Sequence, residues 1–138
     1  MDQARLEFAC PRRQGLFGEL DLALLDPADP DDRHFLILAE HEELAQAIEN
    51  DEEEVLVGGQ PINPRLHITI HEVVTSQLLA DDPPEVWQTA RRLLDADYER
   101  HDVLHMIGSA FTTELWTVWH EGKPADTARY VRALHALR

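Results

Sequence analysis

Hydrophobic residues recur at helical spacing through most of the chain, and runs of proline, glycine and acidic residues separate the segments. In the first long segment, Leu36, Leu44 and Ile48 are separated by eight and four residues, a spacing that places side chains on one face of a helix. Asp29 precedes them as a potential N-cap, directly before a proline suited to the first helical turn. This pattern predicts a helix from residue 30 to about residue 50.

The same periodicity predicts further helices toward the C-terminus. Asn63 and Pro64 combine a capping side chain with a proline in the first turn, which favours a helix at about 64–79. Asp82 is expected to cap the segment after it. These later helices are predicted at about 83–95, 98–120 and 124–137. The segment "LFGELDLALL" is apolar but too short to distinguish helix from strand, and 55–57 is expected to be a short extended piece.

The chain has 138 residues, which suits one compact domain. Residues 1–15 are predicted to form an N-terminal arm, because Pro11 and Gly15 interrupt any regular pattern there. Residues 16–138 contain no low-complexity linker and are predicted to be one helical bundle domain. The expected fold class is therefore all-α, a single-domain helical bundle of four to five helices joined by short turns.

The charge of the chain excludes some functions. Its formal net charge is -15, and acidic residues cluster in "DPADPDDR" and "ENDEEE". Such a surface repels phosphate backbones, so we expect no nucleic-acid partner. No apolar run approaches the roughly 20 residues of a membrane span, and the N-terminus lacks the features of a signal peptide. With Cys10 as the only cysteine, these features predict a cytoplasmic protein without membrane or disulfide.

Two histidine pairs are the candidate metal ligands of this sequence. His67 and His71 lie four residues apart in "NPRLHITIH", and His101 and His105 repeat that spacing in "HDVLH". On a helix, residues four apart have Cβ atoms about 5–6 Å from each other, so both imidazoles can bind one ion. Both pairs have apolar neighbours. If the two helices face each other, they form a four-histidine site for a divalent transition metal, Zn, Fe or Ni.

Other residues could complete or support this site. His41 could supply a fifth ligand, and Glu40 could instead be a carboxylate that holds an imidazole in place. Glu72 follows His71 but is turned from it by about 100° on a helix, so it should not bind the same ion. Glu114 is expected to be a surface or inter-helix carboxylate. The remaining histidines lie near predicted helix ends and are expected to be exposed: His34, His120 and His135.

The runs "NPRLHITIHEVVTSQLLADDPPEVW" and "HDVLHMIGSAFTTELW" resemble an uncharacterised bacterial domain-of-unknown-function family with an Asn-Pro-x-Leu-His-x-x-x-His helix. The resemblance covers roughly residues 33–137, and it places His67 and His71 in the most recognisable block. It implies an all-helical bacterial cytosolic protein and brings no established activity. Arg65 departs from the expected aromatic or aliphatic residue. The second block lacks an acidic residue near Ser109, which would leave the site with histidine ligands only.

Two functional hypotheses follow from these patterns. The first is a metal-binding helical protein whose ion, with one open position, could act as a Lewis acid or carry a redox step. No general base is identified, so no reaction is assigned and enzymatic activity stays open. The second is a non-catalytic protein-interaction or dimerisation module with structural interior histidines. Its partner, a protein or a second copy, would contact helices that carry tryptophans: Trp87, Trp116 and Trp119.

Overall fold

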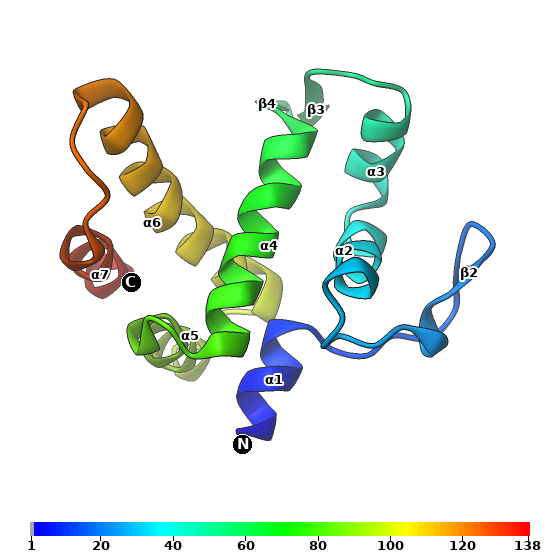
Figure 1. Cartoon of the computed structure of the whole chain (residues 1–138), viewed down its shortest axis with the longest axis horizontal. Helices are drawn as coiled ribbons and strands as arrows, with labels where there is room; N and C mark the ends of the chain where they lie inside the picture. Colours follow the sequence, from blue (N-terminus) through cyan, green and yellow to red (C-terminus); the bar gives the residue numbers. More distant parts are fainter. Residues whose placement is uncertain (1) are drawn as a thin grey trace. The chain divides into compact units, whose positions relative to one another are not determined.

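The computed structural model of the protein describes residues 2–138. Helices make up most of this range, together with two small two-stranded sheets, which confirms the all-α fold class (Figure 1). The chain divides into two compact units, Met1–Glu72 and Val73–Arg138, and the boundary falls within a helix. The elements in order are α1 (Gln3–Ala9), β1 (Leu16–Phe17), β2 (Leu20–Asp21), η1 (Leu22–Leu24), α2 (Pro30–Ala39), α3 (Glu42–Glu49), β3 (Val55–Val57), β4 (Gln60–Ile62), α4 (Pro64–Ala80), α5 (Pro84–Asp95), α6 (Arg100–Glu121) and α7 (Thr127–Ala136).

The helix predicted at 30–50 is divided into α2 and α3. Asp29 caps α2 as expected: its side chain accepts hydrogen bonds from the backbone N–H groups of Asp31 and Asp32. The helix then ends, because His41 has φ -134° and ψ 57°, outside the helical region. The apolar periodicity continues across this break and so does not reveal it. As a result, His41 occupies a corner between two helices instead of a helix face.

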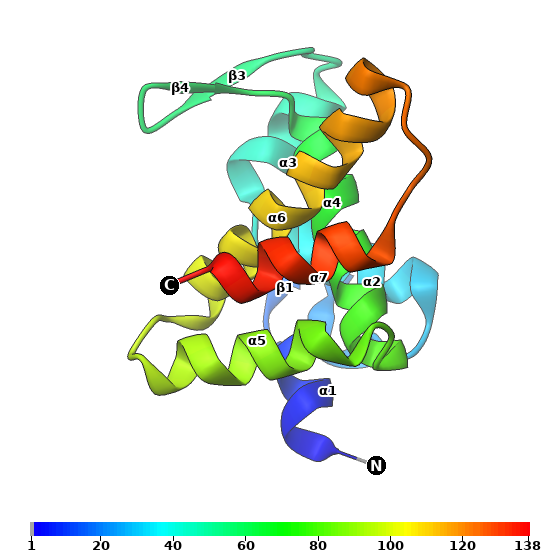
Figure 2. The ribbon, with the colours of Figure 1, turned by 90° about the vertical axis from the view of Figure 1, so that its left-hand side faces the viewer.

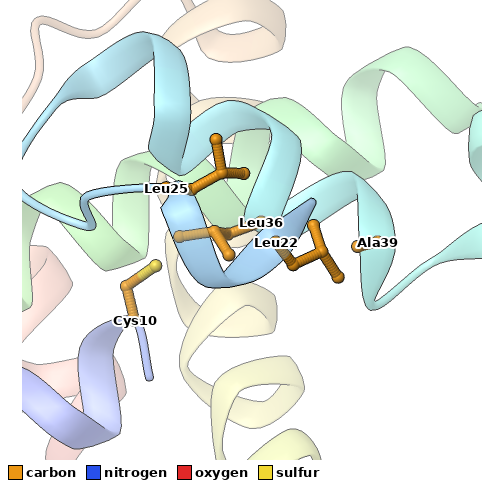
Figure 3. Packing of buried hydrophobic residues seen from close by; sticks show 5 residues of the cluster. All are labelled: Cys10, Leu22, Leu25, Leu36 and Ala39. Atoms are coloured by element: carbon orange, nitrogen blue, oxygen red, sulfur yellow. The ribbon is translucent and has the colours of Figure 1, made fainter. Parts of the chain in front are cut away.

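The N-terminal segment contributes to the core of the first unit. Residues of the predicted arm form α1, in which Asp2 accepts a hydrogen bond from the backbone of Arg5. The ambiguous segment at 16–25 is an antiparallel hairpin, β1–β2, followed by the short 3₁₀ helix η1. Side chains from these segments pack with α2 in one apolar cluster, drawn in Figure 3: Cys10, Leu22, Leu25, Leu36 and Ala39.

A second apolar cluster joins α2, α3 and the first turns of α4. Its buried members are Ile37, Leu44 and Ile68. The β3–β4 hairpin packs against it through half-buried aliphatic residues, with Val55 paired to Ile62 in the antiparallel register. The extended piece predicted at 55–57 is thus confirmed as β3. The cluster fixes the end of α2 against the start of α4, two segments that carry histidines.

The predicted C-terminal helices are confirmed with small changes at their ends. Asn63 accepts a hydrogen bond from the backbone N–H of Leu66 and begins α4. The cap predicted for α5 was wrong: Pro83 occupies the N-cap position, and it has no side chain that can accept a hydrogen bond. Gly122 ends α6 in the left-handed conformation, φ 66°, which glycine adopts without steric cost.

Helices α5, α6 and α7 pack on one another in the second unit, and α5 and α7 lie side by side (Figure 2). Tyr130 on α7 is buried, and its hydroxyl donates to the Gln77 side-chain oxygen at 2.7 Å. Arg129 binds both carboxylate oxygens of Glu114 on α6. Glu114 is therefore an inter-helix carboxylate, as expected. Along residues 2–138 there is no helix with the length and apolar character of a membrane span.

Candidate metal centre

Three histidines come together in the first unit. His41 lies at the corner after α2, and His67 and His71 lie one turn apart on α4. Each offers a ring nitrogen, and these nitrogens lie within 4.8 Å of one another. His41 and His71 are buried, with 9% and 6% of their surface exposed, and His67 is half-buried. The site is thus formed where the second apolar cluster holds α2 against α4.

The ring atoms that meet are the Nε2 nitrogens. Nε2 of His71 is 3.2 Å from Nε2 of His41 and 3.1 Å from Nε2 of His67. The ring centroids are separated by 4.3 Å between His41 and His71 and by 4.8 Å between His67 and His71. His71 is the central member of the three.

A backbone carbonyl fixes the orientation of His41. Its Nδ1 lies 2.8 Å from the carbonyl oxygen of Ile37, which can only accept a hydrogen bond. Nδ1 therefore carries the hydrogen and donates it. In the neutral ring this leaves a lone pair on Nε2, the form that binds a metal. The carbonyl fills the supporting role that Glu40 was predicted to have; whether Glu40 also holds an imidazole stays a prediction.

The small number of N–H hydrogens available around Nε2 of His71 makes this cluster suited to a cation. Nε2 of His71 has two close nitrogen neighbours but can carry one hydrogen at most. Because neutral His41 carries its hydrogen on Nδ1, its Nε2 can only accept, and the single N–H of His71 must then serve both contacts. A metal ion satisfies all three lone pairs at once. In tetrahedral coordination with metal–nitrogen bonds of about 2.0–2.1 Å, ligand nitrogens lie about 3.3–3.4 Å apart, close to the two distances here.

The second histidine pair lies on α6, as predicted. The rings of His101 and His105 are edge to face with centroids 4.3 Å apart. His105 is exposed and His101 is half-buried. The first unit thus supplies three ring nitrogens that could hold one ion, and the second unit carries the other histidine pair on α6. The roles of His101 and His105 as metal ligands stay predictions.

A side-chain contact between α2 and α4 was not anticipated. His34 on α2 contacts the carboxylate of Glu72 on α4 through its Nδ1 atom. His34 is exposed, as predicted, but it is not isolated. No local pattern in the sequence indicates this contact, because it joins residues 38 positions apart. The contact joins α2 to α4 at the residue that follows His71 in the chain.

Comparison with known proteins identifies a family. Residues 29–136 match the model of a family described as a domain of unknown function, DUF1841. No curated protein and no solved structure matches the chain. The predicted resemblance to an uncharacterised domain family is thereby confirmed, whereas its characteristic motif and its bacterial origin stay predictions.

Proposed function

Because this chain belongs to the DUF1841 family, whose description gives no activity, we propose its function from the histidine site: it is a helical protein that binds a divalent transition metal ion. The observation that supports this most is the meeting of three Nε2 atoms around His71, at 3.2 Å and 3.1 Å. Imidazoles without a cation gain little from such an arrangement, since one hydrogen has to serve two contacts.

The donor atoms narrow the choice of metal. An all-imidazole set suits Zn²⁺, Fe²⁺ or Ni²⁺ and is a poor site for Mg²⁺ or Ca²⁺, which prefer oxygen ligands. The lone cysteine, Cys10, lies in a separate apolar cluster and offers no thiolate to this set. The burial of His41 and His71 also favours binding, because a partly dry site strengthens the interaction between cation and ligand.

The number of protein ligands decides what the ion can do. We propose His105 on α6 as the fourth ligand, since it belongs to the second histidine pair of the sequence. Four imidazoles would close a tetrahedral site and make the ion structural. Three imidazoles and a water molecule would leave a Lewis acid with an exchangeable position. No reaction is proposed for that case.

Metal analysis of the untagged protein tests the proposal. We expect about one equivalent of Zn, Fe or Ni after purification, and stoichiometric rebinding of Zn²⁺ by the metal-free chain. His71→Ala should reduce affinity about 100-fold or more, because it removes the central ligand. His120→Ala, which removes an exposed histidine elsewhere on α6, is the matched control. Equal binding by the two variants would overturn the proposal.

The fourth ligand has its own test. His105→Ala and His101→Ala remove one imidazole each from the same helix, one turn apart. With Co²⁺ as a spectroscopic substitute, loss of His105 should change the visible absorption of the bound ion, and loss of His101 should not. Identical spectra for both variants would leave the three-histidine site and remove His105 from it.

A second candidate function rests on α6. Trp116 and Trp119 are 51% and 67% exposed, and Trp116 stacks on His120 with ring centroids 4.7 Å apart. Exposed tryptophans are enriched at protein interfaces, so this face could bind a protein partner or a second copy. Light scattering of the wild type and of Trp119→Ala tests self-association. A monomer at all concentrations, with no change in the variant, would count against a dimer.

A further inference from the structure

A groove on the first unit has no histidine in its lining. It runs between the turn of the β1–β2 hairpin and α3, with a volume of about 540 Å³. This volume is within the range of sites that hold a small ligand or a few side chains of a peptide. Its floor is apolar and consists of half-buried residues: Phe17, Leu38, Ala45 and Ile48.

The rim of the groove is acidic. Glu42 and Glu49 both line it from α3, and both are exposed. Within the described part of the chain, neither forms an ion pair. None of the described residues that line the groove is a lysine or an arginine. A ligand with aliphatic groups between two cations is complementary to this groove, which combines an apolar floor with two carboxylates that form no ion pair.

The spacing of the carboxylates specifies the ligand further. Glu42 and Glu49 are seven residues apart on α3, which is two helical turns, or about 10.5 Å along the axis. Two cations seven residues apart on a partner helix have the same separation, and the residues three and four positions after the first lie on the same face between them. A basic amphipathic helix therefore matches both the charges and the apolar floor.

We propose that this groove binds a basic amphipathic helix of a partner protein. Lysine or arginine side chains of the partner would lie against Glu42 and Glu49, and its aliphatic side chains would contact Phe17 and Ile48. This mode of recognition, a helix laid in a groove, is common among peptide-binding proteins. The groove shares no lining residue with the proposed metal centre, and neither proposal depends on the other.

The test uses the full chain and a labelled helical peptide of about 15 residues. The peptide carries lysines seven residues apart with leucines three and four positions after the first. Fluorescence anisotropy at low ionic strength, where exposed charges are least screened, measures its affinity. The double variant Glu42→Gln with Glu49→Gln should weaken binding about tenfold.

Controls separate this groove from general charge attraction. Glu43→Gln with Glu53→Gln removes two exposed carboxylates outside the groove and changes the net charge equally. This control should change affinity by less than about twofold. If both double variants weaken binding to the same extent, the attraction comes from the net charge of -15 and the proposal is wrong.

A change in the peptide tests the apolar floor without altering the protein. Replacing its two leucines by alanine should weaken binding about tenfold or more, since each buried aliphatic side chain contributes to affinity. Unchanged affinity of the alanine peptide would show that the apolar floor does not take part in binding. Spermidine that binds as tightly as the peptide would show that the groove is a site for polyamines. Self-association of the chain that disappears in the Glu42→Gln, Glu49→Gln variant would instead assign the groove to a second copy. Any of these results overturns the proposal.

Discussion

Glu114 connects the C-terminal half of α6 to the start of α7. Its charge should contribute measurably to the free energy of unfolding. Arg129 donates to both of its carboxylate oxygens, at 2.6 Å and 2.9 Å, and the backbone N–H of Asp126 donates at 3.0 Å. The side chains of Arg129 and Glu114 are only 25% and 11% exposed. Two-point contacts of this kind are among the stronger interactions on a protein surface.

Replacing Glu114 by glutamine keeps its shape and removes its charge. A hydrogen bond to a charged group contributes about 1.5–3 kcal/mol, and the amide can replace only part of this set. We expect the free energy of unfolding at neutral pH to fall by about 2 kcal/mol. Glu121→Gln is the control: its pair with Lys123 has side chains 42% and 57% exposed, and exposed pairs contribute about 0–1 kcal/mol.

The difference between wild type and Glu114→Gln should depend on pH. The hydrogen bond from Arg129 lowers the pKa of Glu114 below 4.5, with smaller help from Asp126 and against the effect of burial. A carboxyl with a lowered pKa in the folded state stabilises the fold above the unfolded-state pKa. That contribution is lost as pH falls through the lower folded-state value. The variant should therefore approach the wild type in acid.

Urea unfolding followed by circular dichroism, repeated from pH 7 downward, measures this difference. The expected result is a gap of about 2 kcal/mol at pH 7 that narrows once the pH falls below 4.5. A gap of equal size at every pH would mean that shape, and not charge, accounts for the loss. An equal loss in Glu121→Gln would contradict the distinction between shielded and exposed pairs.

Three further predictions concern the metal site and two buried side chains, Leu36 in the first unit and Tyr130 in the second. Zn²⁺ at 100 times its dissociation constant should raise the melting temperature of the metal-free chain by about 10 °C. A chelator should reverse this rise, and the His71→Ala variant should not show it. Leu36→Ala removes a side chain that is 1% exposed and should lower the free energy of unfolding by about 3 kcal/mol, measured in urea; a loss below about 1 kcal/mol would contradict the packing in Figure 3. Burial raises the pKa of the Tyr130 phenol, against the effect of its hydrogen bond to Gln77. The unfolded phenol ionises near pH 10, so stability should fall above that pH in the wild type and less steeply in Tyr130→Phe.

Local patterns in the sequence were sufficient for most helices. Asn63 with Pro64, and Asp29 with Pro30, mark the starts of α4 and α2 because capping depends on neighbouring residues alone. The hairpin at β1–β2 was left undecided, since a short apolar run fits a helix or a strand equally well. Packing against α2 resolves such a case, and packing is not a local property.

The candidate site was predictable only in part, because some of its contacts are local in the sequence and others are not. The spacing of His67 and His71 places them on one face of α4 whatever surrounds them. His41 was named as an additional ligand, but its position at a corner, with Nδ1 held by the carbonyl of Ile37, could not be read from the sequence. The contact between His34 and Glu72 joins residues 38 positions apart and also lies beyond local reasoning.

The sequence by itself determined the all-α class, the starts of α2 and α4 and the pairing of imidazoles along single helices, because these depend on contacts within a few residues. Only the tertiary structure decided that the helix before residue 50 breaks at His41 and that its imidazole meets those of α4. That outcome depends on which apolar faces pack together: the cluster of Ile37, Leu44 and Ile68 brings distant segments into contact and so sets the distances among the ring nitrogens.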